Sequence, residues 1–461
     1  MKKILLVNRS KHNIKVFNFS PTQIIALGFA IMALAGAVLL NLPIAARNGQ
    51  SIGFTNALFT ATSAVCVTGL VVVDTNTYWS VFGQVVIITL IQAGGLGFMT
   101  MATLFSLVIG RRVGLKERLT IQESLNEFTL AGVVRTLRNI VITTLFIELA
   151  GALLLAIRLV PAYGLIGGLA RSLFHAISAF CNAGFDIFGS PGSEFVSLTP
   201  FQNDPVILLV ISSLFIVGGL GYLIWRDILI FRKFSELTLH SRVVLLTTAI
   251  LITTGTLLFF FFELYNPKTL GGLPGWSKVL NAYFQAVTPR TAGFNSVSIA
   301  DMTDASKFLT IILMFIGAAP GSTGGGVKIT TFSIIIFAVI SGIKGSEEVN
   351  ILNRRVPEHL TRKTLSIIIL SLILVITTTM VLLVNREGSF MEVLFEATSA
   401  FGTVGLSTGI TPGLGTFSKY AIIITMYLGR IGPLSAAVAI TLLQRKNGLP
   451  YKYPEGRITV G

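Results

Sequence analysis

Long apolar segments dominate the chain and are separated by short polar stretches. A continuous run of about 20 apolar residues has the length that crosses a bilayer as a helix. The pattern predicts eight such spans, at residues 22–42, 81–109, 139–160, 205–231, 241–264, 307–340, 364–384 and 416–443. We therefore expect an all-α membrane protein with eight transmembrane helices.

A shorter motif lies between the two spans of each successive pair. It reads FTATSAVCVTG at 59–69, FHAISAFCNAG at 174–184, FQAVTPRTAG at 284–293 and FEATSAFGTVG at 395–405. Each copy is too short to cross a bilayer, so we expect a half-helix that enters the membrane and turns back. The closing glycines lie 115, 109 and 112 residues apart. This near-constant period predicts four repeats of span, half-helix and span, at 1–110, 111–233, 234–345 and 346–461.

Positive charge is concentrated in the segments that link the predicted repeats. The chain is 52% hydrophobic and only 12% charged, with a formal net charge of +15. Of its 35 Lys and Arg residues, 24 lie in the N-terminal arm, the C-terminal tail and the linkers 110–138, 226–242 and 341–363. Cytoplasmic loops of membrane proteins carry such an excess. Both termini and all linkers are therefore expected on the cytoplasmic side of the cell membrane, and the partner implied by the charge is lipid rather than nucleic acid.

Cysteine and histidine are too sparse for metal or disulfide chemistry. The chain has two cysteines, Cys66 and Cys181, and four scattered histidines, with neither a disulfide framework nor metal-ligand spacing. We expect the cysteines to be small packing residues, and we expect no cofactor in this chain.

Two spans per repeat give all four repeats the same orientation. Parallel repeats are related by rotation about an axis along the membrane normal, so the four turns are expected to meet as a ring around a pore. The half-helices enter from outside, and their C-terminal ends carry a partial negative charge that favours a cation. Because the turns contain no carboxylate, backbone carbonyls are the expected ligands. The ring residues are Val67, Thr68, Gly69, Asn182, Ala183, Gly184, Thr291, Ala292, Gly293, Thr403, Val404 and Gly405.

The second span of the third repeat contains a segment that a continuous helix does not tolerate. Residues 317–328 read GAAPGSTGGGVK, and both glycine and proline destabilise helix interiors. A nucleotide-binding P-loop requires Lys and Ser or Thr directly after its last glycine, whereas Val327 follows Gly326, so we exclude a nucleotide site. The segment is predicted to be an unwound ion site or a movable gate. Its candidate residues are Gly317, Pro320, Gly321, Gly324, Gly325, Gly326 and Lys328.

Arg430 lies midway along the last predicted span, where an arginine is costly and is expected to face the bundle interior or water. One interpretation is a structural salt bridge with Glu396 or Glu148. The other is a positive charge in the permeation path, beside the segment 317–328.

Glu148 is itself interpreted as a member of a pair with Arg158 or as a proton or sodium site. The glycines of the other second spans fit helix packing through small residues.

These features resemble the Trk/Ktr/HKT superfamily of potassium- and sodium-translocating proteins. The resemblance rests on the four motif copies, the RTAGF run at 290–294 and the GRIGP run at 429–433. It extends over about the whole chain and is greatest for the Ktr-type membrane subunit, because no additional pair of spans precedes the first repeat.

The resemblance implies specific roles and partners. The closing glycines of the four copies are expected to be the filter glycines, and 317–328 with Arg430 is expected to be an intramembrane gate. A glycine at position 69, where sodium-selective plant members typically carry serine, favours potassium. The chain is expected to form a homodimer and to bind a separate RCK-type regulatory ring that carries the nucleotide. The third copy is one residue shorter than the others, which leaves the register of its half-helix open.

The sequence thus predicts a potassium-uptake pore subunit, and not an enzyme, with potassium as its substrate. The alternative is a secondary carrier that couples potassium to sodium or protons, which would require strict dependence on an ion gradient. A third reading is a membrane receptor or scaffold, in which the four turns serve packing alone and no ion flux occurs.

Overall fold

The computed structural model describes most of the chain between residues 20 and 435. The described residues are 20–97, 133–231, 233–346 and 348–433, together with Thr100, Gly114, 118–120, Gln122 and Ser435. Within them the chain is helical except for loops and one small antiparallel hairpin, β1 (Asn350–Ile351) and β2 (Arg354–Arg355). The N-terminal arm, most of the linker 110–138 and the C-terminal tail, which we predict to be cytoplasmic, lie outside the described residues.

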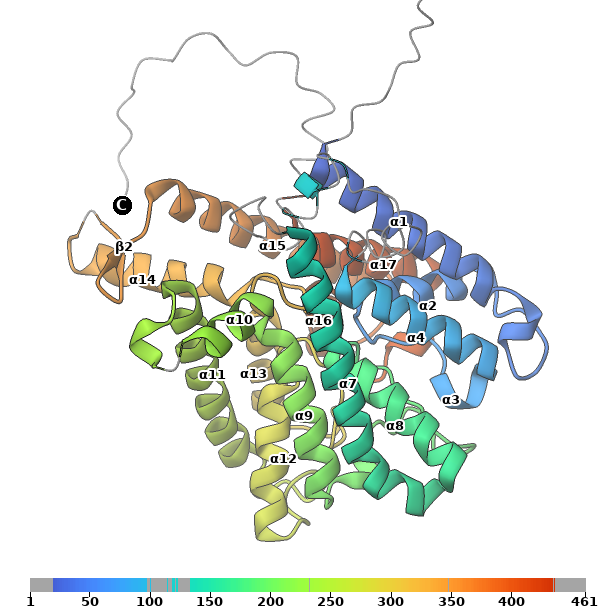
Figure 1. Cartoon of the computed structure of the whole chain (residues 1–461). Helices are drawn as coiled ribbons and strands as arrows, with labels where there is room; N and C mark the ends of the chain where they lie inside the picture. Colours follow the sequence, from blue (N-terminus) through green and yellow to red (C-terminus); the bar gives the residue numbers. More distant parts are fainter. Residues whose placement is uncertain are drawn as a thin grey trace, which may run out of the picture.

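Within the described part of the chain, four helices are long and apolar enough to cross a bilayer, and counting one bent pair as a span gives five. The four are α1 (Pro21–Leu40), α7 (Val133–Tyr163), α11 (Leu239–Glu263) and α15 (Glu358–Val384) (Figure 1). Large apolar side chains such as Phe146 and Ile376 are exposed on their outer faces, as expected for surfaces in contact with lipid. The prediction of a mostly helical membrane protein is confirmed at this level.

Shorter helices carry the four motif copies. They are α2 (Phe54–Cys66), α8 (Leu165–Phe180), α12 (Gly275–Val287) and α16 (Phe390–Gly402). These half-helices are the most deeply buried elements, and the phenylalanines that open three of the copies, Phe59, Phe284 and Phe395, are fully buried. Each half-helix ends at the turn of its copy.

We call each half-helix, together with the long helix before it and the shorter helix after it, a group. The shorter helices form a third set, which connects neighbouring groups. It consists of α4 (Val81–Leu96), α9 (Pro205–Leu220), α13 (Asp304–Phe315) and α17 (Thr416–Ile431). Each member contacts the half-helix of the following group, because α4 packs on α8, α9 on α12, α13 on α16 and α17 on α2. The last contact joins the end of the chain to its beginning, so the four groups form a closed circle (Figure 1).

These connecting helices are shorter than the spans predicted from hydropathy. The prediction of one continuous span at 205–231 is wrong, because α9 and α10 (Tyr222–Ile230) meet at 93°. Gly221 lies at the bend with a φ of 87°, and α4 and α17 end before Gly97 and Gly432, whose φ values are 87° and 93°. A left-handed residue ends an α-helix, and hydropathy does not report it. The sequence predicted an interruption in the third repeat, and the break at Gly221 is an additional one.

The third group contains the longest interruption. The helix stops after α13 and resumes as α14 (Ile329–Ile343), with the segment 317–328 between them, as its glycine and proline content predicts. The remaining short elements are α3 (Thr75–Tyr78) and the 3₁₀ turns η1 (Pro43–Ala45), η2 (Thr199–Phe201), η3 (Phe234–Glu236) and η4 (Thr411–Gly413).

Candidate functional site

The four turns share one backbone shape. The residue two positions before each glycine has a positive φ, at 57°, 60°, 73° and 50° for Val67, Asn182, Thr291 and Thr403. The closing glycines have φ values of 92°, 67°, 79° and 92° for Gly69, Gly184, Gly293 and Gly405. Residues other than glycine rarely adopt positive φ. Positive φ recurs at four equivalent positions, which indicates that the fold requires this turn conformation.

The four glycines lie against one another in a ring. A Cβ atom added to any of them would meet, at less than 3.0 Å, the carbonyl oxygen of the residue that precedes the next glycine. The pairs are Gly69 with Ala183, Gly184 with Ala292, Gly293 with Val404, and Gly405 with Thr68. Backbone carbonyls therefore surround a common centre, and the positions of the four glycines leave no room for a side chain.

Backbone hydrogen bonds resolve the register of the shorter third copy. In the first, second and fourth copies, the N–H of the residue before the glycine donates to the carbonyl five residues earlier, at 2.8, 2.8 and 2.9 Å. In the third copy, Ala292 donates to Thr288, four residues earlier, at 2.9 Å. This tighter closure absorbs the missing residue, so α12 delivers its turn to the same ring.

One face of the ring opens into a cavity of about 580 Å³. All four ring glycines line it, together with Asp74, Asp186 and Glu194. The Asp74 carboxylate accepts hydrogen bonds from the backbone N–H groups of Thr77 at 2.8 Å and Phe195 at 2.9 Å. Burial raises the pKa of Asp186 to about 7, and the nearby Asp74 carboxylate adds to this rise. We call this space the outer cavity. Asp74 and Glu194 supply its other acidic side chains, and an acidic lining attracts cations toward the ring, whereas the raised pKa reduces the negative charge that Asp186 contributes near neutral pH.

The segment 317–328 packs against the opposite face of the ring. A Cβ atom at Gly324 would meet the Thr291 side-chain oxygen, and a Cβ atom at Gly325 would meet that of Thr403, both at less than 3.0 Å. Thr323 donates from its hydroxyl to the Phe180 carbonyl at 3.3 Å. The glycines thus allow the segment to lie directly under the third and fourth turns.

The amide of Asn182 links the turns to this segment. It lies 3.0 Å from the Thr291 hydroxyl and 3.2 Å from the Thr323 hydroxyl. The side chain is fully buried and does not line the outer cavity. Asn182 is the one ring residue whose side chain joins a second turn to the segment below.

Neighbouring helices anchor the segment on both sides. Ala319 donates from its backbone N–H to the Gly219 carbonyl at 3.0 Å, and Tyr222 donates to the Gly321 carbonyl at 3.3 Å. Lys328 donates from Nζ to the Gly324 carbonyl at 2.6 Å. These bonds attach the segment to the break between α9 and α10 and close it on itself.

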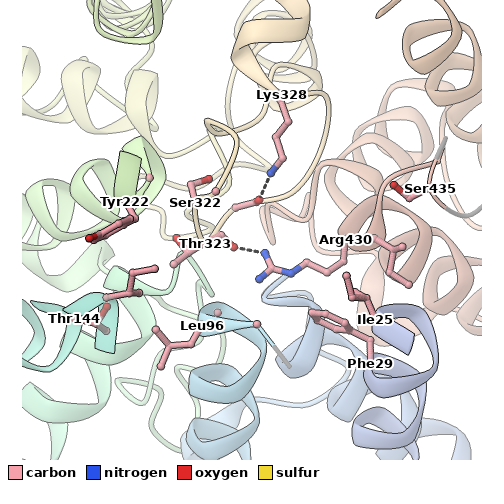
Figure 2. Close-up of a pocket in the computed structure, with 18 of the residues that line it drawn as sticks. Ile25, Phe29, Leu96, Thr144, Tyr222, Ser322, Thr323, Lys328, Arg430 and Ser435 are labelled. Atoms are coloured by element: carbon pink, nitrogen blue, oxygen red, sulfur yellow. Dashed lines mark hydrogen bonds between the residues drawn. The ribbon is translucent and has the colours of Figure 1, made fainter. Parts of the chain in front are cut away.

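Arg430 joins the segment to the first group of helices. It donates from Nη1 to the Thr323 carbonyl and from Nη2 to the Gly94 carbonyl, and its guanidinium carbon lies 5.8 Å from the centre of the Phe29 ring. Figure 2 shows Arg430 and Lys328 approaching the segment from different directions. Arg430 is the penultimate residue of α17, and most of the predicted span 416–443 beyond Gly432 lies outside the described residues.

The structure gives other partners than the salt bridges that the sequence suggested as one interpretation of Arg430 and Glu148. Among the described residues Arg430 makes no ion pair, and Arg158 pairs with Asp204, with Nε 2.7 Å from Oδ2. Glu148 instead accepts a hydrogen bond from Gln92 at 3.1 Å. These pairings depend on which helices are neighbours, and the sequence does not contain that information.

Below the segment lies a second cavity of about 320 Å³, which we call the inner cavity (Figure 2). Gly97, Gly221, Lys328, Lys363 and Arg430 are among its lining residues. The described lining includes no carboxylate and none of the twelve ring residues. The segment and Arg430 therefore separate the ring from the inner cavity.

The sequence predicts that the other glycines of the connecting helices serve packing. In the structure they are of two kinds, those that contact a half-helix and those that end a helix. Cβ atoms at Gly94, Gly218 and Gly429 would meet half-helix carbonyls, those of Val65, Phe180 and Phe401. Three residues later, Gly97, Gly221 and Gly432 end the helices. The shared four-residue pattern of two glycines at 94–97, 218–221 and 429–432 was the signal that could have identified them.

Comparison with known proteins identifies the family of the chain. The model of the TrkH family, described as cation transport protein, matches residues 1–448. The chain is 43% identical to Ktr system potassium uptake protein B of Bacillus subtilis (strain 168), over 97% of this chain and 98% of that protein. It is 39% identical to potassium/sodium uptake protein NtpJ of Enterococcus hirae, over 96% and 97% of the two chains. Its fold resembles the crystal structure of the potassium transporter TrkH from Vibrio parahaemolyticus, with a TM-score of 0.71 and 17% identity over 93% of this chain and 86% of that one. The chain belongs to the TrkH family of cation transport proteins.

Proposed function

We propose that this chain is the ion-translocating pore subunit of a potassium uptake system in the cell membrane. The observation that carries the proposal is the ring, in which four turns from four parts of the chain present glycines and carbonyls to one centre. Carbonyl oxygens can replace the hydration shell of a weakly hydrated cation. The names of the relatives, potassium uptake protein B and potassium/sodium uptake protein, support potassium as the substrate.

In this proposal the ring is a selectivity filter. Its ligands are backbone carbonyls of Val67, Thr68, Gly69, Asn182, Ala183, Gly184, Thr291, Ala292, Gly293, Thr403, Val404 and Gly405. The half-helices α2, α8, α12 and α16 direct their partially negative C-terminal ends toward the ring. The acidic outer cavity adds to this field and raises the local cation concentration. Potassium enters from the outer cavity and moves inward down its electrochemical gradient.

The segment 317–328 and Arg430 form the gate. A fixed positive charge in a low-dielectric passage raises the barrier to a cation, and the two bonds of Arg430 hold the segment across the path. The gate residues are Gly317, Pro320, Gly321, Gly324, Gly325, Gly326, Lys328 and Arg430. Opening requires Arg430 and the segment to move apart, and the two arrangements need differ by only a few kcal/mol.

The proposed assembly follows the four-repeat organisation. Repeats at 1–110, 111–233, 234–345 and 346–461 surround the pore, with eight spans in total and both termini in the cytoplasm. The chain forms a homodimer in the membrane and binds a separate cytosolic regulatory ring of the RCK type, which carries the nucleotide. Transport by the Ktr systems named among the relatives supports this division of labour.

Potassium flux through purified protein in liposomes tests the proposal, and Gly69→Ser tests the filter. A side chain at position 69 would collide with the Ala183 carbonyl and is strained by the φ of 92°. We expect a loss of potassium over sodium discrimination of about tenfold, which corresponds to about 1.4 kcal/mol. Gly272→Ser is the matched control, because its nearest atom is 3.7 Å away and its φ is not positive.

Two outcomes contradict the proposal. Absence of potassium flux would favour a receptor or scaffold, and flux that depends strictly on a proton or sodium gradient would favour a secondary carrier. An unchanged ratio of potassium to sodium uptake in Gly69→Ser protein would remove the ring from the selectivity mechanism.

A further inference from the structure

The residue after the phenylalanine of each motif copy is polar and buried. These residues are Thr60, His175, Gln285 and Glu396, with exposed fractions of 1%, 0%, 3% and 0%. They occupy equivalent positions in the four half-helices, one turn or more before the ring. Burying a polar group is unfavourable unless it finds a hydrogen-bond partner, so the partners of these four residues indicate what each one does.

Glu396 binds the irregular chain that leaves the fourth turn. We call such a stretch an outgoing strand, although it is not a β-strand. Its Oε1 atom accepts hydrogen bonds from the Ser407 hydroxyl and, at 3.0 Å, from the Thr411 hydroxyl. Its Oε2 atom is buried and has no hydrogen-bond partner among the described residues. Ser407 is two residues beyond Gly405 of the ring, so the carboxylate holds the outgoing chain directly after the filter glycine.

His175 does the same for the second turn. Its Nε2 atom accepts a hydrogen bond from the Ile187 backbone N–H at 3.2 Å. Its Nδ1 atom lies 2.7 Å from the Arg171 carbonyl, so Nδ1 carries the proton and the ring is neutral. Ile187 is the third residue after Gly184, and Ser407 and Thr411 are the second and sixth residues after Gly405. The histidine and the glutamate therefore each hold the outgoing strand close to a ring glycine.

The other two copies lack this contact. Thr60 donates to the Asn56 carbonyl of its own helix at 3.0 Å. In the third copy, the Gln285 side-chain nitrogen and the Ser296 hydroxyl, which occupies the third position after Gly293, are both buried without a hydrogen-bond partner among the described residues. The contact thus joins half-helix to outgoing strand in the second and fourth groups, which face each other across the ring.

We propose that His175 and Glu396 are positioning residues for ion selection, acting through the strands that leave the filter. The inference rests on the proposed pore function. By holding Ile187 after Gly184, and Ser407 and Thr411 after Gly405, the two side chains fix the direction in which the carbonyls of two opposite turns point. Neither side chain lines the outer cavity, so they influence the ion without touching it.

The two contacts differ in strength. Glu396 accepts hydrogen bonds from two hydroxyl groups, whereas His175 accepts one from a backbone N–H. Loss of the Glu396 contact therefore has the larger effect on selectivity.

The ratio of potassium to sodium uptake into proteoliposomes tests the inference. Glu396→Leu removes the contact and is expected to reduce the ratio about tenfold. Glu396→Gln keeps an oxygen that accepts from Ser407 and Thr411, and is expected to stay within about threefold of the parent. His175→Phe keeps a ring but loses the acceptor, and is expected to reduce the ratio about threefold. Thr60→Val, whose hydroxyl bonds only its own helix among the described residues, is the matched control and is expected to behave as the parent.

The variants distinguish three effects of Glu396 on selectivity: positioning of the outgoing strand, direct action of its charge on the ion, and stabilisation of the fold. If Glu396→Gln loses as much discrimination as Glu396→Leu, the negative charge acts directly on the ion and the inference is wrong. It is also wrong if well-folded Glu396→Leu and His175→Phe proteins keep the parent ratio. Should Glu396→Leu not fold, Thr411→Val removes one donor at 3.0 Å and is expected to lower the ratio by a smaller factor, with an unchanged ratio counting against the inference. Absence of flux in the parent protein refutes the proposed function itself, and the inference falls with it.

Discussion

Two adjacent interruptions of the connecting helices use very different lengths of chain. Between α9 and α10 the helix direction changes by 93° at a single residue, Gly221. Between α13 and α14 the segment 317–328 separates the two helices. The two breaks are in contact, because Ala319 donates to the Gly219 carbonyl and Tyr222 donates to the Gly321 carbonyl.

Ending a helix and filling the space under the ring require different lengths of chain. One left-handed glycine is enough to end a helix in this fold, as Gly97 and Gly432 also demonstrate. The additional residues of 317–328 are therefore not needed for the break itself. They place Gly324 and Gly325 against Thr291 and Thr403 of the ring, and this contact is the basis of the proposed gate.

The largest effect is expected from converting the long interruption into a short one. Deletion of 321–326 removes the part of the segment that lies against the ring and leaves α13 and α14 connected. Potassium flux into proteoliposomes is expected to rise more than tenfold and to lose its dependence on the proposed regulatory ring. A deletion protein that folds, as judged by size-exclusion chromatography, but carries less potassium than the parent would show the segment to be a structural support.

An intermediate effect is expected from a side chain at the short break. Gly221 and Gly97 both have a φ of 87°, with ψ of 154° and 139°. Alanine occupies this region at a cost of roughly 1–3 kcal/mol, so both variants are expected to lose similar unfolding free energy. Among the described residues, the new Cβ at Gly221 lies 2.9 Å from the Pro320 carbonyl of the segment, whereas none lies within 4 Å of the new Cβ at Gly97. Gly221→Ala is therefore expected to change flux severalfold and Gly97→Ala to leave it unchanged. Equal flux in the two variants would mean that the breaks are not coupled.

The smallest effect is expected from one hydroxyl between the ring and the segment. Thr323→Val removes the bonds of the Thr323 hydroxyl to the Phe180 carbonyl and the Asn182 amide, each worth about 0.5–1.5 kcal/mol. Flux is expected to rise a few-fold. Thr310→Val is the matched control, since the Thr310 hydroxyl bonds the Ser306 carbonyl within α13. A rise of the same size in the control would assign the effect to general loosening.

The sequence predicted the elements that repeat and missed those that depend on backbone conformation. Four near-copies with a constant period led to four equivalent turns, and the composition of 317–328 led to an interrupted helix. The breaks at Gly97, Gly221 and Gly432 were not predicted, because a hydropathy pattern continues through a left-handed residue. The register of the third copy required the hydrogen bond from Ala292 to Thr288.

Buried polar partners were the least predictable feature. Arg158 was assigned to Glu148 on sequence proximity, but the fold brings it to Asp204 on a neighbouring helix. The partners of His175 and Glu396 lie 11 to 15 residues further along, in irregular chain that no periodicity describes. Pattern identifies the residues that face a core, whereas the identity of a hydrogen-bond partner follows from tertiary contacts alone.

The central claim is that Arg430 and the segment 317–328 together close the path beneath the ring. Potassium flux through Arg430→Ala protein in liposomes, without any regulatory ring, tests it most directly. Arg430→Lys is the matched control, because a lysine keeps the positive charge but its single ammonium group does not reproduce the planar fork that binds both the Thr323 and Gly94 carbonyls. We expect flux to rise strongly in Arg430→Ala protein and less in Arg430→Lys protein. A well-folded Arg430→Ala protein that carries the same amount of potassium as the parent, or less, would contradict the account.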